Sequence, residues 1–374
     1  MRVRRVSTLA FRNLADATVE LGEGVTLLWG ENGAGKTNLL EALYLGLAGR
    51  SPRTKADREA IAFGKPLARV EVDVDAADGM ASRTFLCAIE RAGERRHQVD
   101  GRAVDAAAQA ELRPALSVFM PDRLVLVKGP PAARRAHVDR FAAALRPARA
   151  EPRRRYGRAL AQRNALLARI RAGAAAEASL EAWDAELSEA GIELMEVRAD
   201  VCRTLVTGFA ELAGELGLAG EAALRYRPRS EASSAPELAL ELAERRAGDL
   251  ARGFTTHGPH LDELVLARDG RSLRKYGSQG EQRLALLALL FAERAALVEA
   301  GRPVPMMLLD DVTSELDPQR RASLCRRLIA GGGQALITAT EASQLPAECP
   351  RAELAMREGR LLAPAAGGES AEAA

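Results

Sequence analysis

Gly30-Glu31-Asn32-Gly33-Ala34-Gly35-Lys36-Thr37 is the stretch that decides the fold of this 374-residue chain. It follows a short apolar run at residues 25–29 and precedes an apolar helical pattern over residues 38–47. The spacing GxxxxGK[ST] between a strand and a helix is typical of a phosphate-binding loop. Its glycines allow backbone N–H groups to approach phosphate oxygens, and the N-terminus of the following helix favours an anion. We therefore predict a nucleoside triphosphate site, formed by Gly30, Glu31, Asn32, Gly33, Ala34, Gly35, Lys36, Thr37 and Asn38.

The charged and hydroxyl side chains of this motif have separate expected roles. Lys36 supplies a cation between the β- and γ-phosphates, and the hydroxyl of Thr37 is a ligand for Mg²⁺. A buried strand, Met306–Leu309, ends in Asp310 and Asp311, which supply the second half of such a site. We expect Asp310 to hold Mg²⁺, while Lys36 and Asp311 are catalytic, Asp311 by orienting the attacking water. The alternative for the acidic pair is that it only caps a loop.

The pattern along the chain predicts an α/β fold that is split by a helical insertion. Alternating and apolar runs predict strands in the first third of the chain, and the Ala/Leu/Glu/Arg-rich middle has helical spacing. Gly173, Gly191 and Gly208 interrupt this middle part too often for a long coiled coil, so we expect a helical hairpin or small bundle. The predicted parts are an ATPase lobe from residues 1–120 and 254–363, a helical lobe at 121–253 and a disordered tail at 364–374.

The composition is that of an ordinary globular protein. Hydrophobic residues make up 47%, charged residues 28%, and the net charge of +2 by itself predicts no partner. Apolar runs fall short of the roughly 18 to 20 residues of a membrane span, and the chain starts in a strand pattern instead of a signal segment. We expect a cytoplasmic protein without a membrane partner. Four scattered cysteines are expected to be buried small hydrophobes in a reducing compartment, namely Cys87, Cys202, Cys325 and Cys349.

Two further motifs resemble those of the ABC-type ATPases. Ser278-Gln279-Gly280-Glu281 precedes a long apolar helix and resembles their signature motif, and Ser314-Glu315-Leu316-Asp317 resembles their D-loop. The resemblance implies an ABC-type P-loop ATPase head with a helical insertion lobe, in which Mg·ATP brings two subunits together. It assigns Ser314 and Asp317 to the D-loop, and it places Ser278, Gly280 and Glu281 against the γ-phosphate held by the opposite subunit. A plain helix N-cap is the alternative role of Ser278.

Within this superfamily the chain resembles the RecF family, which is related to the SMC proteins. Phe11-Arg12-Asn13-Leu14 resembles its FRN motif, Gly49-Arg50-Ser51-Pro52-Arg53-Thr54 its GRSxRT stretch, and Gly258-Pro259-His260-Leu261-Asp262 its GPHRD element, with Leu261 in place of the family's arginine. Further motifs in the same order cover nearly the whole chain. The resemblance implies an ATP-dependent homodimer that clamps double-stranded DNA near single-strand gaps, hydrolyses ATP slowly and helps load a recombinase, with RecR and RecO as partners.

The resemblance also adds candidate contacts to ATP and DNA. It places Arg12 and Asn13 at the ATP site, and the alternative for Arg12 is a surface arginine. Arg50, Arg53 and Lys55 follow the first helix, and a second basic run that includes Arg153 and Arg154 enters the helical lobe. Either cluster could neutralise DNA phosphates, and the alternative for each is a solvated surface. No recognition helix or aromatic platform is evident, so we expect recognition of the DNA backbone and shape.

Two positions differ from most ABC-type ATPases and are similar to RecF proteins. Asp311 replaces the usual glutamate and is one methylene shorter, and Thr340 stands where transporters have a switch histidine. Both imply slow turnover, which fits a switch better than a motor. The alternatives are a transporter nucleotide-binding subunit and a short SMC-like structural ATPase. The missing histidine opposes the first, and the lack of hundreds of coiled-coil residues opposes the second. The Q-loop glutamine is left unassigned.

Overall fold

The structure is a computed structural model that describes residues 1–54, 56–75, 81–105, 109, 112–314 and 316–362. Its contacts define two compact units, one formed by residues 1–123 together with the chain from 303 onward, and one formed by residues 124–302. The second unit therefore extends past the predicted lobe boundary at 253, because helix α10 (Gln279–Glu299) packs along helix α6 (Leu180–Glu215) inside it. The division into an ATPase lobe and a helical lobe at residues 121–253 stays a prediction. Across the described ranges, every helix is too short or too polar to span a lipid bilayer.

The first unit contains an antiparallel six-stranded sheet in the order β2-β1-β4-β5-β6-β7. The alternating sequence of β4 buries Val70, Val72 and Val74, as period-two patterning predicts. Helix α1 (Lys36–Ala48) packs on this sheet so closely that a Cβ on its Gly46 would lie 2.6 Å from Val72 Cγ2. The strands are β1 (Arg2–Leu9), β2 (Ala17–Glu20), β4 (Leu67–Asp75), β5 (Arg83–Glu90), β6 (Arg95–Val99) and β7 (Arg102–Ala103).

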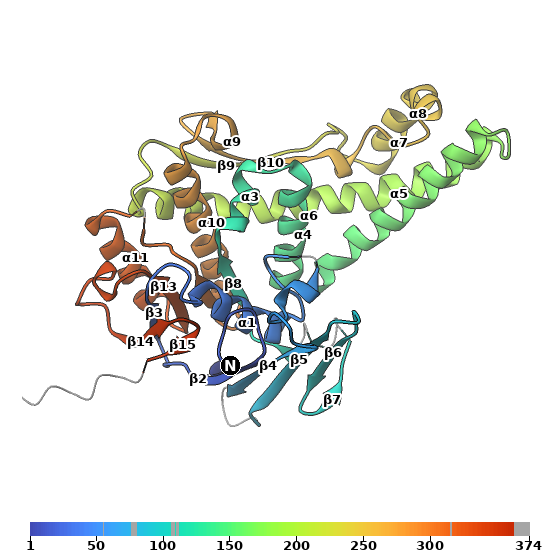
Figure 1. Ribbon diagram of the computed structural model, residues 1–374. Helices are drawn as coiled ribbons and strands as arrows, with labels where there is room; N and C mark the ends of the chain where they lie inside the picture. Colours follow the sequence, from blue (N-terminus) through green and yellow to red (C-terminus); the bar gives the residue numbers. More distant parts are fainter. Residues whose placement is uncertain (55, 76–80, 106–108, 110–111, 315, 363–374) are drawn as a thin grey trace, which may run out of the picture. The chain divides into compact units, whose positions relative to one another are not determined.

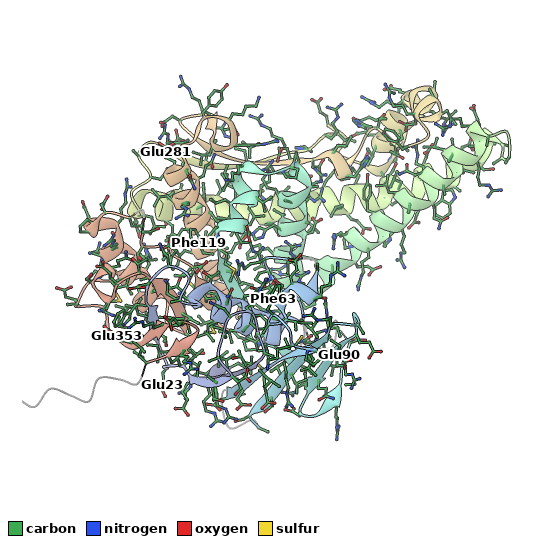
Figure 2. All side chains as sticks on the ribbon, in the orientation of Figure 1. Glu23, Phe63, Glu90, Phe119, Glu281 and Glu353 are labelled. Carbon is green, nitrogen blue, oxygen red and sulfur yellow. A yellow bond between two sulfur atoms is a disulfide. The ribbon has the colours of Figure 1, made fainter. Side chains whose placement is uncertain are left out.

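The second sheet of this unit has the order β15-β14-β3-β13-β12-β8 and is parallel except for β15. Its central strands are buried and almost entirely apolar, as expected for a parallel sheet covered on both faces. Phe119, labelled in Figure 2, ends β8 and pairs with Leu309 of β12. The strands are β3 (Val25–Trp29), β8 (Leu116–Phe119), β12 (Met306–Leu309), β13 (Ala335–Ala339), β14 (Arg351–Arg357) and β15 (Arg360–Leu361).

Helix α11 (Pro318–Ala330) of this unit corrects the expectation for two cysteines. Cys325 on α11 is joined by a disulfide to Cys349, which precedes β14. Sequence spacing gave no signal for this pair, because 24 residues separate two cysteines that the fold brings to a Cα–Cα distance of 5.9 Å. Cys87 and Cys202 are buried free thiols as predicted, and burial raises the pKa of each to about 12. The short 3-10 helices of the first unit are η1 (Asp57–Ala60) and η6 (Ala342–Gln344), and η2 (Pro121–Leu124) lies at the boundary between the two units in the sequence.

The second unit is built on an antiparallel helical hairpin of α5 (Ala150–Arg171) and α6, which confirms the predicted hairpin (Figure 1). Of the three glycines expected to interrupt the helices, only Gly173 does so. It lies in the turn between α5 and α6 and has φ +73°. Helix α6 continues through Gly191 and Gly208 for 36 residues. A Cβ at Gly191 would lie 2.8 Å from Leu238 Cδ2, so this glycine permits close packing of a neighbouring helix and does not end α6.

A small antiparallel sheet and shorter helices complete the second unit. Strand β9 (Ala222–Arg227) lies within the stretch predicted to be helical and pairs with β10 (Glu263–Arg268), which pairs with β11 (Arg271–Ser272). The helices are α3 (Val125–Lys128), α4 (Pro131–Leu145), α7 (Ala235–Glu244), α8 (Arg246–Arg252) and α9 (Leu273–Tyr276). The 3-10 helices are η3 (Pro147–Arg149), η4 (Glu177–Ser179) and η5 (Pro259–Leu261).

A buried arginine ties three helices of the second unit together. Arg163 of α5 is fully buried and donates from Nε to Asp184 of α6 (2.6 Å) and from Nη1 to Asp249 of α8 (2.7 Å). It also donates to the hydroxyl of Thr255 at 2.8 Å. A buried charge is tolerated only with such partners, and this one cation joins α5, α6 and α8.

Candidate functional site

The predicted phosphate loop lies at the carboxyl end of β3, beside the carboxyl ends of β13 and β12. This edge of a parallel sheet is where α/β proteins bind ligands. Gly33 and Gly35 have φ values of +83° and +108°, which favour glycine over residues with a Cβ. Lys36 Nζ is close to the loop backbone and donates to the carbonyls of Gly30 (2.6 Å) and Glu31 (2.8 Å). The loop therefore surrounds its own lysine.

Thr37 and Asp310 meet at this edge. Thr37 Oγ1 lies 2.9 Å from Oδ1 and 3.0 Å from Oδ2 of Asp310, and Thr338 of β13 donates to Oδ1 at 2.8 Å. Burial raises the pKa of Asp310, with the hydrogen bonds from Thr338 and Thr37 acting in the opposite direction. A hydroxyl and a carboxylate are the oxygen ligands that Mg²⁺ prefers, so this donor set fits the predicted metal.

Lys36 carries a charge that the surroundings disfavour. Its pKa is lowered by burial, although Asp311 and Asp310 act to raise it. The lysine is only 9% exposed. An anion placed beside it would relieve this burial penalty, because an opposite charge stabilises the charged form of a lysine.

Asp311 has a left-handed backbone with φ +48°, and its N–H donates to Thr338 Oγ1 at 2.9 Å. Residues other than glycine hold this conformation only when their surroundings fix it, and such residues gather at functional sites. Thr338 therefore contacts both carboxylate residues, one through each hydrogen-bonding function of its hydroxyl. Thr340, at the predicted switch position, accepts from Gln344 Nε2 at 2.7 Å.

The predicted D-loop follows directly. Ser314 Oγ donates to the carbonyl of Asp311 at 3.1 Å, and Asp317 is the N-cap of α11, accepting from the N–H of Arg320 at 2.9 Å. Glu315 between them lies outside the described residues. The segment is thus fixed at both ends, to the acidic pair and to α11.

Arg12, Asn13 and Asn38 lie next to the phosphate loop. Arg12 also has a positive φ of +51°, and its guanidinium donates to the carboxylate of Glu41 on α1 instead of extending into solvent. Asn13 Nδ2 donates to the carbonyl of Gly33 at 3.0 Å, and Asn38 Nδ2 donates to Asn13 Oδ1 at 2.7 Å. The structure therefore brings these three predicted ATP contacts to the phosphate loop.

The first group of DNA candidates differs from residue to residue. Arg50 is exposed and lies near the hydroxyl of Tyr44; burial alone would raise the pKa of Tyr44, but Arg123, Arg50 and Arg113 lower it. Arg53 is partly exposed and also contacts the nucleotide edge, because its Nη1 donates to Asn38 Oδ1 (2.8 Å) and to Glu41 Oε2 (3.0 Å). Lys55 lies outside the described residues.

The predicted signature motif begins α10 in the second unit, where Figure 2 labels Glu281. Ser278 and Glu281 form a capping box, in which Ser278 Oγ accepts from the Glu281 N–H (3.3 Å) and Glu281 Oε2 from the Ser278 N–H (2.8 Å). Arg268 pairs with the other oxygen of Glu281. Gly280 has open space around it, because a Cβ built there would meet none of the described atoms within 4 Å. Packing against the described part of the chain therefore does not explain this glycine.

Arg153 and Arg154 border a pocket of about 690 Å³ in the second unit. Helix α5 contributes them together with Arg158, and Arg135 and Arg198 join from α4 and α6. Arg153 and Arg154 are 55% and 67% exposed, and their acidic partners are Asp139 (3.4 Å) and Glu151 (2.8 Å). The pocket is thus an accessible surface with more arginines than carboxylates.

Two side chains of the nucleotide edge were missed by the sequence analysis. Thr338 is the hydroxyl residue of an otherwise apolar strand, and Glu41 is the carboxylate of an otherwise apolar part of α1. A polar residue inside a wholly apolar run was the available signal, since such residues are buried only with hydrogen-bond partners.

Comparison with known proteins decides the family. The family model for the RecF/RecN/SMC N terminal domain matches residues 2–357. A DNA replication and repair protein RecF from Anaeromyxobacter sp. (strain Fw109-5) is 39% identical over 382 residues, covering 97% of this chain and 99% of that protein. The chain belongs to the RecF family. RecF of Deinococcus radiodurans is also 39% identical, over 345 residues that cover 91% of each chain.

Solved structures agree with the RecF assignment and with the predicted fold. A structure of the recombination mediator protein RecF–ATP in the RecFOR pathway is 27% identical with a TM-score of 0.83, covering 97% of this chain and 98% of that one. An Smc head bound to the C-winged helix domain of ScpA is 15% identical with a TM-score of 0.61, which shows a shared fold alone. The RecF resemblance and the ABC-type ATPase head fold with a helical lobe are thereby confirmed.

Proposed function

We propose that this chain is an ATP-controlled DNA clamp acting in DNA replication and repair. Mg·ATP joins two copies, the dimer holds double-stranded DNA near single-strand gaps, and slow hydrolysis releases it. The observation that carries the proposal is the meeting of Thr37 with Asp310 beside the phosphate loop, in a chain whose family includes a solved RecF–ATP structure. The similarity to the solved RecF–ATP structure supports ATP as the ligand.

The phosphates of ATP are proposed to lie over residues 30–38, with Arg12 and Asn13 at the edge of the site. Lys36 has the charge to exchange its two loop carbonyls for β- and γ-phosphate oxygens, because charge-assisted hydrogen bonds are the stronger ones. Thr37 and Asp310 are the residues that would hold Mg²⁺, which neutralises charge on the phosphate oxygens when bound.

Asp311 is proposed to orient the water that attacks the γ-phosphate. Its left-handed backbone and its bond to Thr338 fix the start of its side chain. Because aspartate is one methylene shorter than glutamate, we expect slow turnover, so that ATP acts as a switch.

The dimer is proposed to form when Ser278, Gly280 and Glu281 of one copy approach the γ-phosphate held by the other, with Ser314 and Asp317 nearby. The open space at Gly280 supports this, because a helix N-terminus without a side chain lets a phosphate approach the backbone. The capping box orders the same turn in the protomer.

DNA is proposed to contact the two basic clusters through its phosphates, Arg50, Arg53 and Lys55 in one and Arg153 and Arg154 in the other. Exposed arginines suit this role because they pair with phosphate oxygens and release counterions. RecR and RecO are the protein partners that the family suggests, since a relative is described as a mediator in the RecFOR pathway. We expect the clamp to help load a recombinase in the cytoplasm.

The test is the mass in solution by light scattering, with ADP, with a non-hydrolysable ATP analogue, and with that analogue plus gapped DNA. We expect a dimer with the analogue that gapped DNA reinforces. A monomer in all three conditions would overturn the shared-site mechanism.

Ser278→Arg sharpens the test. We expect this variant to bind the ATP analogue and stay monomeric, because the added side chain would clash with the γ-phosphate of the nucleotide bound to the other copy. Ser233→Arg adds the same side chain at an exposed position of the same unit and should dimerise normally.

A further inference from the structure

Glu41 is a fully buried carboxylate that three side chains share. Arg12 donates to it twice, from Nε to Oε2 at 3.1 Å and from Nη2 to Oε1 at 2.8 Å. Ser51 Oγ donates to Oε1 at 2.6 Å, and Arg53 Nη1 donates to Oε2 at 3.0 Å. Removal of its charge would weaken the bonds from both arginines and replace one acceptor oxygen by a donor, so Glu41 fixes where both guanidinium groups lie.

The two arginines belong to different candidate sites. Arg12 follows β1 and lies beside the phosphate loop, since its neighbour Asn13 donates to Gly33. Arg53 belongs to the segment at residues 49–54, which includes two of the DNA candidates. Glu41 on α1 accepts hydrogen bonds from both arginines, and its Oε2 is shared by Arg12 Nε and Arg53 Nη1.

Ser51 extends this contact into the backbone of the 49–54 segment. Its Oγ donates to Glu41 and accepts from the N–H groups of Arg53 (3.0 Å) and Thr54 (3.2 Å). The conformation of the segment therefore depends on the same carboxylate that orients Arg12.

A second chain of hydrogen bonds connects Arg53 with the phosphate loop. Arg53 Nη1 donates to Asn38 Oδ1, Asn38 donates to Asn13, and Asn13 donates to the carbonyl of Gly33. Arg53 is thus connected to the phosphate loop by side chains at every step. With a side chain 34% exposed, Arg53 can still reach a ligand in solvent.

We propose that Glu41 is a positioning residue common to both sites, which orients Arg12 toward the nucleotide phosphates and Arg53 toward DNA phosphates. This inference rests on the proposed function, because it requires that the chain binds ATP and DNA. It adds that one buried carboxylate serves both.

Double-mutant cycles test the inference. Glu41→Gln keeps the size of the side chain and removes its charge. We expect it to weaken the affinity for a fluorescent non-hydrolysable ATP analogue, and the affinity for duplex DNA at saturating analogue, each on the order of tenfold, the scale of a lost supporting contact. Arg12→Gln should weaken ATP binding and Arg53→Gln should weaken DNA binding.

The cycles separate positioning from a general effect on the fold. In an Arg12→Gln background, Glu41→Gln should cause little further loss of ATP affinity, and in an Arg53→Gln background little further loss of DNA affinity. Losses that simply multiply in both backgrounds would overturn the inference. Glu293→Gln is the matched control, because Glu293 is a buried carboxylate paired with His137 in the other unit, and it should change neither affinity.

Two further outcomes are distinguished. If Glu41→Gln does not fold, Glu41→Asp replaces it in the same two cycles, because it keeps the charge and shortens the reach of the carboxylate, and losses that simply multiply in both backgrounds overturn the inference. Wild-type protein that binds neither the analogue nor DNA would instead refute the proposed function.

Discussion

Thr37 Oγ1 lies within 3.0 Å of both carboxylate oxygens of Asp310, although 273 residues separate the two along the chain. The contact joins the start of α1 to the end of β12, so the fold itself assembles two oxygen ligands from distant segments. Thr338, between them on β13, holds Asp310 from the other side. The metal-binding half of the proposed site is therefore organised by the protein alone.

The Thr37 hydroxyl gives the first prediction. Thr37→Val keeps the shape of the side chain and removes the hydroxyl, so we expect Mg²⁺-dependent ATP hydrolysis to fall by roughly 10- to 100-fold, the range seen when support to a metal is lost. Thr37→Ser keeps the hydroxyl and should retain most activity. Steady-state hydrolysis measured over a Mg²⁺ titration checks both, and equal losses in Val and Ser variants would contradict a ligand role.

Acid should weaken Mg·ATP binding through Asp310. The ionised carboxylate is the form that binds a cation, and burial raises its pKa above the usual aspartate value. Affinity should therefore be full above that raised pKa and be lost as the pH falls through it, at a higher pH than an ordinary aspartate would give. Analogue titrations across acidic pH check this. Asp310→Asn should bind Mg·ATP weakly and lose this pH dependence; an unchanged profile would contradict the assignment.

Gly280→Ala separates stability from dimerisation. Alanine is the better helix former, by up to about 1 kcal/mol, and the new Cβ has open space, so the protomer should be at least as stable. If a phosphate of a second copy approaches here, ATP-dependent dimerisation should weaken by roughly tenfold. Thermal unfolding and light scattering measure the two quantities. Full dimerisation of a stable variant would remove Gly280 from the interface.

The local pattern of the chain was enough to predict the phosphate loop, the strands around it and the acidic pair, because each is a continuous stretch with its own periodicity. What it could not predict depends on contacts between distant segments. Strand β9 lies in a helix-like composition and forms because β10 pairs with it. Gly191 permits a helix contact instead of ending α6, and the roles of Thr338 and Glu41 appear only when their partners arrive from other elements.

Loss of the Arg163 charge should destabilise the second unit strongly. Arg163→Met would leave Asp249 buried without its cation and Asp184 with Arg246 alone, and breaking a buried pair in this way costs about 3–5 kcal/mol. Denaturant unfolding measures the change. Arg158→Met on the same helix, where the side chain is 73% exposed, should change the free energy of unfolding by less than about 1 kcal/mol. Similar values for the two variants would contradict the role given to the buried network.

The pocket arginines provide the last prediction. Arg153→Ala combined with Arg154→Ala should weaken duplex DNA binding at all sequences and reduce the slope of log affinity against log salt by about 2, since each phosphate contact contributes about 0.9. Arg203→Ala is the control, because this exposed arginine lies on α6 away from the pocket lining. An unaltered salt slope would assign DNA binding to residues other than this pair.

The unbroken run of α6 has a mechanical consequence. Thirty-six helical residues extend about 54 Å, so a tilt of ten degrees about one end would displace the other by about 9 Å. Because α6 is a single stiff rod braced by α5, an angular change at its base would reach the tip as a translation larger than the width of a single strand. The hairpin can therefore act as a lever arm.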